Sequence, residues 1–418
     1  MNPTTSKDSP TPIRMTSRQR VLMALRHREP DRLPIDFGSM RSTGIMAIAY
    51  ARLKKHLGLS TGKIRVYDMF QQLAEVEPDV LQRFGIDVID LSNTLGEDDP
   101  SGWKPWTLPD GTPCLVPATE DLRPAKDGGW YIWKEGLPHQ RMPPGGLYFD
   151  RVYHPLSDAA NSADLKAYQW PRLNDETLRD LQRRAEVLNK HTDFAIMAHF
   201  GGNILETGQG LRGWEQFMID LVGKGAFLED LLGLIVEAHL TNLPLFLEAV
   251  GDYVQIIQFG DDLGMQDRPL ISPRMYQETI KPCHQQIYSY VHQHSNCSVF
   301  LHSCGSIYQL IPDLIDVGVN ILNPVQTSAA NMAPARLKTE FGEQITFWGG
   351  GCNTQQVLPN ATPDEVAKHV LEQIQTFAPG GGFIFNQIHN IQANVPPENV
   401  VAMFDEASSY QGADSGTR

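Results

Sequence analysis

Short apolar runs alternate with longer amphipathic stretches along most of the chain. Runs rich in β-branched and aromatic residues predict strands, and apolar residues repeating every three to four positions predict helices. An opening helix is predicted over 17–26, with Ser17 as its N-cap. The predicted strands are 33–37, 88–91, 194–200, 253–259, 298–303, 320–324, 345–349 and 383–388. Most are followed by a helical pattern, as at 273–292 and 363–377, so the sequence predicts an α/β fold of the (β/α)₈ TIM-barrel class.

The interval between the second and third strands is long, about 96–175, and it is rich in aromatic residues, prolines and glycines. A segment that follows a barrel strand lies over the carboxyl-terminal mouth, where active sites are found. We expect an insertion of hairpins that covers the mouth, and a merely decorative surface insertion is the alternative. The expected organisation is a disordered leader over 1–14, one barrel over 15–408 and a flexible tail over 409–418.

Composition narrows the class of protein. The chain of 418 residues is 41% apolar and 20% charged, which is typical of a globular protein, and its net charge of −14 argues against nucleic-acid binding. No run of about 18 apolar residues predicts a membrane span, and the first residues lack an apolar signal core. Five cysteines, an odd number, fit a reducing compartment, so a cytoplasmic protein with a small-molecule substrate is expected.

A candidate metal site lies at two strand ends. His302 and Cys304 lie two positions apart in N-C-S-V-F-L-H-S-C-G at 296–305, so their side chains project to the same side. Cys352 follows the seventh strand, two strands along, within reach of that pair. Three such ligands with an open fourth position are typical of catalytic zinc. The alternative is a core histidine with two buried thiols.

Further polar residues follow other predicted strands, which marks the mouth as an active site. Three of them are the predicted catalytic residues, Asp261, His389 and Asp36, and Asp261 or His389 is also a candidate fourth zinc ligand. Another three are predicted to bind a cofactor: Asn323, Gln326 and His199. For each of the six, capping the next helix or bonding a loop is the alternative.

Several segments in order resemble the uroporphyrinogen decarboxylase superfamily, over about 16–407. They include T-S-R-Q-R-V-L-M-A-L at 16–25, D-R-L-P-I at 31–35, H-S-C-G-S at 302–306 and F-W-G-G-G-C at 347–352. The resemblance implies a distorted (β/α)₈ barrel, often paired as a homodimer. It also implies one of two activities: metal-free decarboxylation of a porphyrinogen, or zinc-dependent methyl transfer through a His-x-Cys…Cys motif.

Departures from the decarboxylase pattern favour the second activity. Of the two arginines in the decarboxylase loop only Arg41 remains, because Ile45 takes the place of the other, and Asn93 stands where the essential acid is expected. The resemblance therefore implies a methyltransferase that uses zinc and a corrinoid, the latter carried by a partner corrinoid protein, with a thiol or methylated small molecule as substrate. Zinc would activate the sulfur or heteroatom that exchanges the methyl group. Porphyrinogen decarboxylation and a non-catalytic binding protein on the same scaffold are the alternatives.

Overall fold

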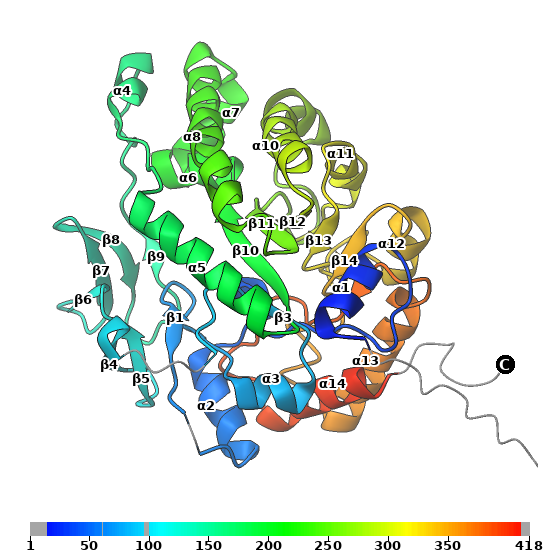
Figure 1. Ribbon diagram of the computed structural model, residues 1–418. Coiled ribbons are helices and arrows are strands. Elements are labelled where there is room, and N and C mark those ends of the chain that lie inside the picture. Colours follow the sequence, from blue (N-terminus) through cyan, green and yellow to red (C-terminus); the bar gives the residue numbers. More distant parts are fainter. Residues whose placement is uncertain (1–14, 61, 96–99, 411–418) are drawn as a thin grey trace, which may run out of the picture.

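The computed structural model describes residues 15–60, 62–95 and 100–410, so the predicted leader and most of the predicted tail lie outside the described residues. A parallel sheet of seven strands curls through the centre in the order β15-β14-β13-β12-β11-β10-β3 (Figure 1). These strands are β3 (Val88–Asp90), β10 (Ala195–Gly201), β11 (Ile256–Gly260), β12 (Ser298–His302), β13 (Ile321–Asn323), β14 (Thr346–Trp348) and β15 (Phe383–Ile384).

The segment 33–37 joins the two edges of this sheet. The amide of Asp36 donates to the carbonyl of Phe385 at 2.9 Å, and the amide of Asp87 donates to the carbonyl of Ile35 at 2.8 Å. Pro34 has no amide hydrogen, so the segment makes isolated bridges instead of a regular ladder. The eight predicted strand regions thus form a closed, irregular barrel, and the predicted fold class is confirmed.

Helices surround the barrel. They are α1 (Ser17–Leu25), α2 (Ala47–His56), α3 (Pro78–Phe84), α5 (Asp175–His191), α6 (Leu205–Arg212), α7 (Trp214–Gly223), α8 (Ala226–Val250), α9 (Pro273–Met275), α10 (Lys281–His294), α11 (Ile311–Asp316), α12 (Pro334–Phe341), α13 (Pro363–Phe377) and α14 (Pro397–Ser409). The predicted N-cap of the first helix is wrong by one residue. Thr16 caps α1, because its hydroxyl accepts from the amide of Gln19 at 3.2 Å.

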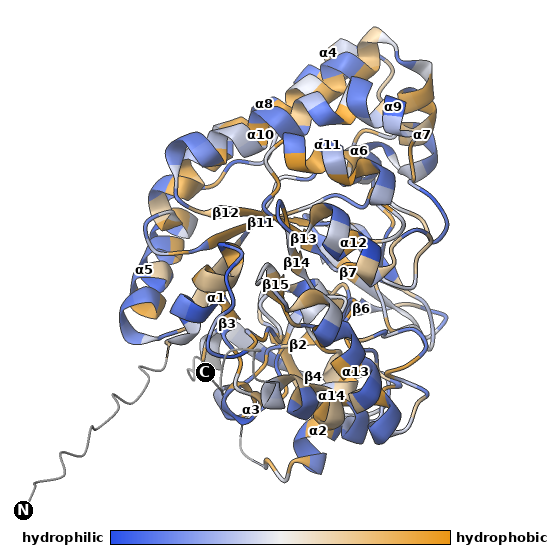
Figure 2. Ribbon diagram, turned by 90° about the vertical axis from the view of Figure 1, so that its right-hand side faces the viewer, coloured by the Kyte–Doolittle hydropathy of each residue, from blue (hydrophilic) through white to orange (hydrophobic). Residues whose placement is uncertain are grey.

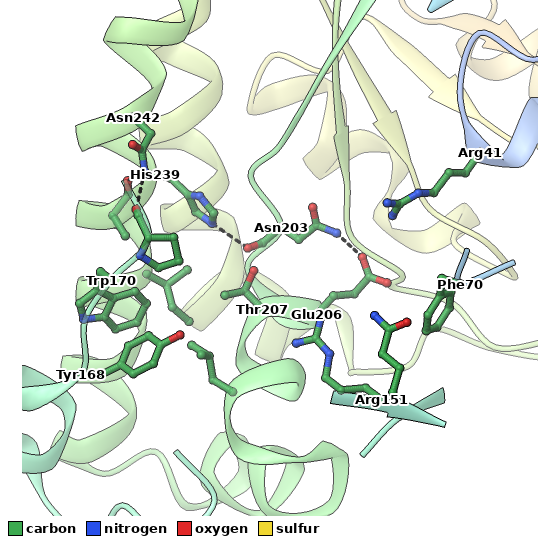
Figure 3. Close-up of a pocket in the computed structure, with 15 residues that line it drawn as sticks. Arg41, Phe70, Arg151, Tyr168, Trp170, Asn203, Glu206, Thr207, His239 and Asn242 are labelled. Carbon is green, nitrogen blue, oxygen red and sulfur yellow. Dashed lines mark hydrogen bonds between the residues drawn. The ribbon is translucent and has the colours of Figure 1, made fainter. Parts of the chain in front are cut away.

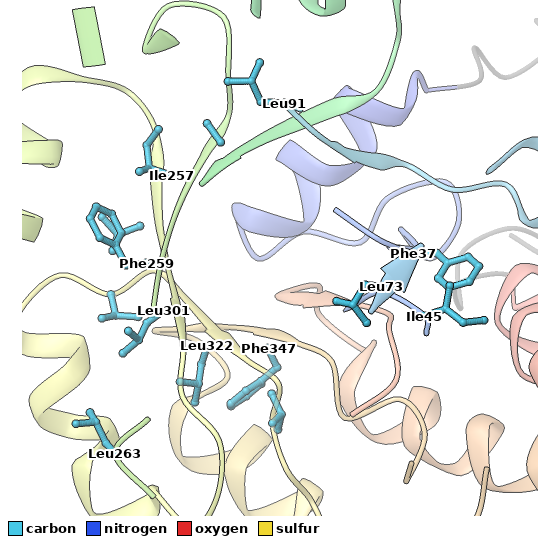
Figure 4. Packing of buried hydrophobic residues seen from close by; sticks show 14 of the residues in the cluster. Phe37, Ile45, Leu73, Leu91, Ile257, Phe259, Leu263, Leu301, Leu322 and Phe347 are labelled. Atoms are coloured by element: carbon cyan, nitrogen blue, oxygen red, sulfur yellow. The ribbon is translucent and has the colours of Figure 1, made fainter. Parts of the chain in front are cut away.

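Alternation along the strands builds two apolar layers. Ile257 and Phe259 of β11, like Leu301 of β12, belong to the larger cluster between barrel and helices (Figure 4). The neighbouring residues along the same strands, Ile256 and Phe300, point into the barrel instead. There they pack with Val88 of β3 and Trp348 of β14. The interior is therefore a packed core, and Figure 2 shows β11 and β12 as hydrophobic ribbons beneath helices that carry hydrophilic residues.

The insertion between β3 and α5 is built from antiparallel hairpins. One pair is β4 (Trp103–Thr107) with β5 (Pro113–Pro117). A four-stranded sheet follows, formed by β6 (Asp121–Pro124), β7 (Trp130–Lys134), β8 (Leu137–Met142) and β9 (Asp150–Arg151), and then α4 (Ser162–Ala167). Ahead of the insertion, β1 (Val66–Asp68) pairs with β2 (Leu73–Ala74). In Figure 1 the hairpins flank the barrel on the side of β1 and α6.

The sequence pattern predicted no membrane-spanning segment, but helix α8 is long and apolar enough to be a candidate for one. Its mean hydropathy is 1.3, and it is the single such helix in the part of the chain that the structure describes. Charged residues such as Glu229 and Glu237 interrupt its apolar run, so the sequence pattern does not single it out. Because α8 packs against α4, α5 and α10, it takes the place of an outer helix of the barrel.

Candidate metal centre

The loop that follows β12 holds the predicted His-x-Cys pair. His302 ends the strand, and its Nε2 lies 3.4 Å from the Sγ of Cys304. The carboxylate of Asp262 accepts from the amide of Cys304 at 2.8 Å, and the side-chain oxygen of Gln326 accepts from the amide of Gly305 at 2.9 Å. Gly305 has φ +87°, and a Cβ there would lie 2.6 Å from the backbone of Gly264. Only glycine fits this turn, which presents the two side chains together.

The orientation of the His302 ring is fixed by Asn323. The Nδ1 of His302 lies 2.7 Å from the Oδ1 of Asn323, which also accepts from the hydroxyl of Ser42 at 2.6 Å. The Nδ2 of Asn323 donates to the carbonyl of Trp348 at 2.9 Å, which identifies the amide nitrogen. Nδ1 of His302 must therefore be the donor, which leaves Nε2, the nitrogen that faces the Cys304 sulfur, to bind a metal. Asn323 thus orients the histidine that was predicted to hold the metal, and Gln326 holds its loop.

His389 completes a group of three possible ligands. One ligand atom each of His302, Cys304 and His389 lies within 4.8 Å of the others, the one group of this kind among the described residues. His389 has φ 62°, a backbone conformation that is uncommon for a residue with a side chain. Burial, and then the neighbouring His302, lower the pKa of His389 to about 4, so the ring is neutral near pH 7. Two imidazoles and one thiol are donors that fit zinc.

Binding a metal must displace the Cys304 proton. Burial first, and then the nearby carboxyl groups of Asp262 and Glu206, raise the pKa of the Cys304 thiol well above its ordinary value. A thiol ligates zinc as the thiolate, so a cation at this site competes with a proton.

Cys352 lies in the loop after β14 and is fully buried. Its carbonyl accepts from the amide of Ile388 at 2.9 Å, which ties its backbone to the residue before His389. Its sulfur does not belong to the group of mutually close ligand atoms. The assignment of Cys352 as a zinc ligand therefore stays a prediction, and His389, predicted as a catalytic residue or fourth ligand, is the third member of the group.

Asp261 lies behind the centre. Its carboxylate accepts from the amides of Ile204, Leu205 and Glu206 at 3.1, 2.9 and 2.9 Å, and it lies 3.0 Å from Nε2 of His284. The side chain is fully buried, and it caps α6 from a neighbouring strand end. Capping of a helix is the alternative expected for such a residue, and a catalytic role for Asp261 stays a prediction.

Asp36 is likewise enclosed within the barrel. Its carboxylate accepts from the amide and hydroxyl of Ser39 at 3.0 and 2.7 Å and from the indole of Trp348 at 2.8 Å. Burial raises the pKa of Asp36 to about 6. Neither Asp36 nor Asp261 lines the two cavities described next, so both carboxylates hold neighbouring backbone and side chains in place without facing a cavity.

Two cavities meet at the mouth of the barrel. The inner cavity, of about 390 Å³, is lined by His302 and His389 together with His199, whose Nδ1 pairs with Gln258. The outer chamber, of about 590 Å³, lies against the insertion (Figure 3). The two share the lining residues Arg41, Asn203 and Glu206. Of the residues predicted for cofactor binding, His199 is therefore the one that faces the inner cavity.

Carboxyl groups surround the inner cavity. Asp68 pairs with Arg41 at 2.6 Å. Burial raises the pKa of Asp90, at the end of β3, to about 6. Burial, and then the charges of Asp262 and Asp261, raise the pKa of Glu206 to about 8. Glu206 was not predicted, although its place three residues after Asn203 in the turn that follows a barrel strand is a usable sequence signal.

The structure corrects one sequence-based comparison. Asn93 was taken as the counterpart of the essential acid, but its amide donates to the carbonyl of Val76 at 3.3 Å, and it does not line the inner cavity. Asp90, three residues earlier, ends the strand and lines it. A carboxyl group is therefore present at this strand end, and only the buried Ile45 still departs from the decarboxylase pattern.

A closed α/β barrel with ligating and acidic side chains at its mouth is typical of a TIM-barrel enzyme. Residues 203–410, just under half of the chain, match the family model "Uroporphyrinogen decarboxylase (URO-D)". The resemblance drawn from the sequence is thereby confirmed. No curated protein matches the chain.

A solved structure shows the same fold. A methyltransferase from Methanosarcina mazei shares 18% sequence identity, covers 94% of this chain and 98% of its own, and superimposes with a TM-score of 0.57. A GH10 endoxylanase retrieved from a sugarcane soil metagenome shares 10% identity over 56% of this chain and 85% of its own. Its TM-score of 0.35 is too low to support an argument. At this level of identity the first match speaks for the barrel alone.

Proposed function

We propose that the protein is a zinc-dependent methyltransferase. It moves a methyl group between a corrinoid (cobalamin-type) cofactor, carried by a separate corrinoid protein, and a thiol or methylated small molecule. The observation that carries the proposal is the group of His302, Cys304 and His389 ligand atoms within 4.8 Å of one another, two of whose residues line the inner cavity. The URO-D match over residues 203–410 and the barrel shared with the Methanosarcina mazei methyltransferase support it.

The donors suit zinc, and the site is accessible to a substrate. His302 is 15% exposed toward the cavity, so three protein ligands leave room for a substrate atom in the fourth position. When bound there, zinc acts as a Lewis acid that lowers the pKa of a thiol or polarises a methylated heteroatom. Asn323 holds the ligating nitrogen of His302 in place, and Cys352 remains the alternative third ligand.

Glu206 is the side chain best placed to exchange a proton with a substrate. It lines both cavities, and Asn203 holds its carboxyl group by a hydrogen bond. A pKa raised to about 8 by burial lies close to neutral pH, where a group both accepts and releases protons readily. We assign it to accept the proton that a substrate thiol loses. The corrinoid partner, a homodimer and a cytoplasmic location are further parts of the proposal.

Porphyrinogen decarboxylation remains the second candidate because of one observation. Asp90 and Arg41 both line the inner cavity, so an acid and an arginine lie at the mouth, as decarboxylation of an acidic tetrapyrrole requires. The His302–Cys304–His389 group has no part in that reaction.

An anaerobic assay separates the two activities. Zinc-loaded protein is mixed with methylcobalamin and 2-mercaptoethanol, and the methylcobalamin absorbance is followed. We expect zinc-dependent loss of methylcobalamin, which Cys304→Ala lowers by at least about 100-fold. Cys297→Ala is the matched control, because this buried thiol donates to the carbonyl of Val254 at 3.4 Å, away from the cavities. Transfer that is indifferent to Cys304→Ala, or metal-free conversion of uroporphyrinogen, contradicts the proposal.

A further inference from the structure

The outer chamber is a second binding space beside the metal cavity. It lies between the insertion and helices α6 and α8 (Figure 3). One end has the aromatic pair Tyr168 and Trp170, whose ring centroids are 5.2 Å apart in an edge-to-face arrangement. The other end has Phe70 and Arg151. Its volume of about 590 Å³ is that of a pocket for a small organic molecule.

Arg151, an exposed residue, places its positive charge at the wall of this chamber. Within the described residues its guanidinium makes no ion pair or hydrogen bond, whereas Arg123 and Arg141 of the same insertion pair with Asp121 and Asp127. Arg41, which also lines the chamber, pairs with Asp68. Glu206, which also lines the chamber, is held by Asn203 and makes no ion pair with Arg151. A free guanidinium at the wall of an organic pocket fits an oxyanion.

The local backbone is adapted to the position of this arginine. A Cβ on Gly210 of α6 would lie 2.1 Å from Nη1 of Arg151, so glycine lets the guanidinium lie directly against the helix. A larger residue at position 210 would force the guanidinium to move.

We propose that the outer chamber binds a small organic oxyanion as the methyl donor or acceptor. Arg151 pairs with its acid group, and its apolar body packs between Phe70 and the Tyr168–Trp170 pair. The reacting atom then extends past Asn203 and Glu206, which line both cavities, toward the metal centre. This inference rests on the proposed methyl transfer and names the class of its substrate.

Benzoate and its neutral counterpart benzamide test the inference by calorimetric titration of the full-length protein, with and without zinc. We expect wild type to bind benzoate at least tenfold more tightly than benzamide, because only benzoate gains the charged hydrogen bonds. Arg151→Gln should lower benzoate affinity at least tenfold and leave benzamide binding unchanged. Gly210→Ala should weaken benzoate binding in the same sense, and Arg123→Gln is the matched control that binds like wild type.

Equal binding of the two probes, no binding by wild type, or full benzoate affinity in Arg151→Gln overturns the inference. Thermal unfolding of each variant shows that a loss of affinity is not a loss of folding. The proposed function is judged separately. Methyl transfer to 2-mercaptoethanol without any benzoate binding defeats only the chamber inference, and Arg151-dependent benzoate binding by a protein that neither holds zinc nor transfers methyl groups defeats only the proposed function.

Discussion

Replacing Asn323 by alanine tests how the ligating histidine is oriented. The amide contacts Nδ1 of His302 at 2.7 Å, the hydroxyl of Ser42 at 2.6 Å and the carbonyl of Trp348 at 2.9 Å, and the last two contacts are fully buried. Without it, the imidazole is free to turn and to change its protonated nitrogen. Loss of such an outer partner typically lowers metal affinity about 10–100-fold, so Asn323→Ala should weaken zinc binding by that factor.

The same change should destabilise the fold. Each buried group left without a partner costs about 1–3 kcal/mol, and water entering the vacated space offsets part of the sum for three groups. We expect a loss of about 2–4 kcal/mol in the free energy of unfolding. Ser42→Ala is the matched control, because the amide keeps its contacts with His302 and Trp348 and zinc affinity should change little.

Competition with a chromophoric chelator measures zinc affinity, and urea unfolding followed by tryptophan fluorescence measures stability. Asn323→Ala protein that is folded and binds zinc as tightly as wild type would refute the reasoning. Equal losses of affinity in Asn323→Ala and Ser42→Ala would refute it as well, because the two changes would then act through general disorder of the mouth.

Further predictions concern buried charge and protonation. Asp261→Asn should cost about 3–5 kcal/mol in urea unfolding, since it breaks a buried charged network, whereas Asp262→Asn, whose side chain is 44% exposed, should cost less than about 1 kcal/mol. Between pH 6 and 8 zinc affinity should rise with pH, because the raised pKa of Cys304 means that binding displaces its proton. The logarithm of the zinc affinity should rise by about one per pH unit for each cysteine ligand. If Cys352→Ser leaves the slope of this plot unchanged, Cys352 is not a zinc ligand. The pKa of His389 is lowered to about 4 from 6.5, so as the pH falls this histidine is protonated in the unfolded chain before it is protonated in the folded one. Metal-free protein should therefore lose stability as the pH falls from about 6.5 toward 4, and in melting curves His389→Asn should lose less than wild type.

Local pattern was sufficient to predict the barrel. Strand residues alternate between the barrel interior and the helix layer, as Ile256 and Ile257 do, and this alternation depends on neighbours in sequence. The same reasoning placed His302 beside Cys304, because side chains two positions apart at a strand end point to the same side of the strand. The irregularity of the first strand follows from Pro34, which is also readable from the sequence.

Contacts between distant loops were beyond reach of the sequence. The choice between His389 and Cys352 depends on a left-handed backbone at His389 and on how the loop after β14 folds back, and neither follows from spacing. Arg151 reaches the mouth only because the insertion folds against Gly210 of α6. The acid at the mouth is Asp90, and Asn93 does not face the cavity. A shift of a few residues at a strand end changes which side chain faces the cavity, and the sequence does not reveal such a shift.

X-ray absorption at the zinc K-edge tests the central claim most directly. For zinc-loaded wild type we predict about one zinc per chain, with sulfur at about 2.3 Å and imidazole nitrogen at about 2.0 Å. Cys304→Ala should lose one sulfur from the spectrum or fail to retain zinc. A wild-type spectrum with oxygen and nitrogen neighbours only, unchanged in Cys304→Ala, would contradict the assignment of the metal centre.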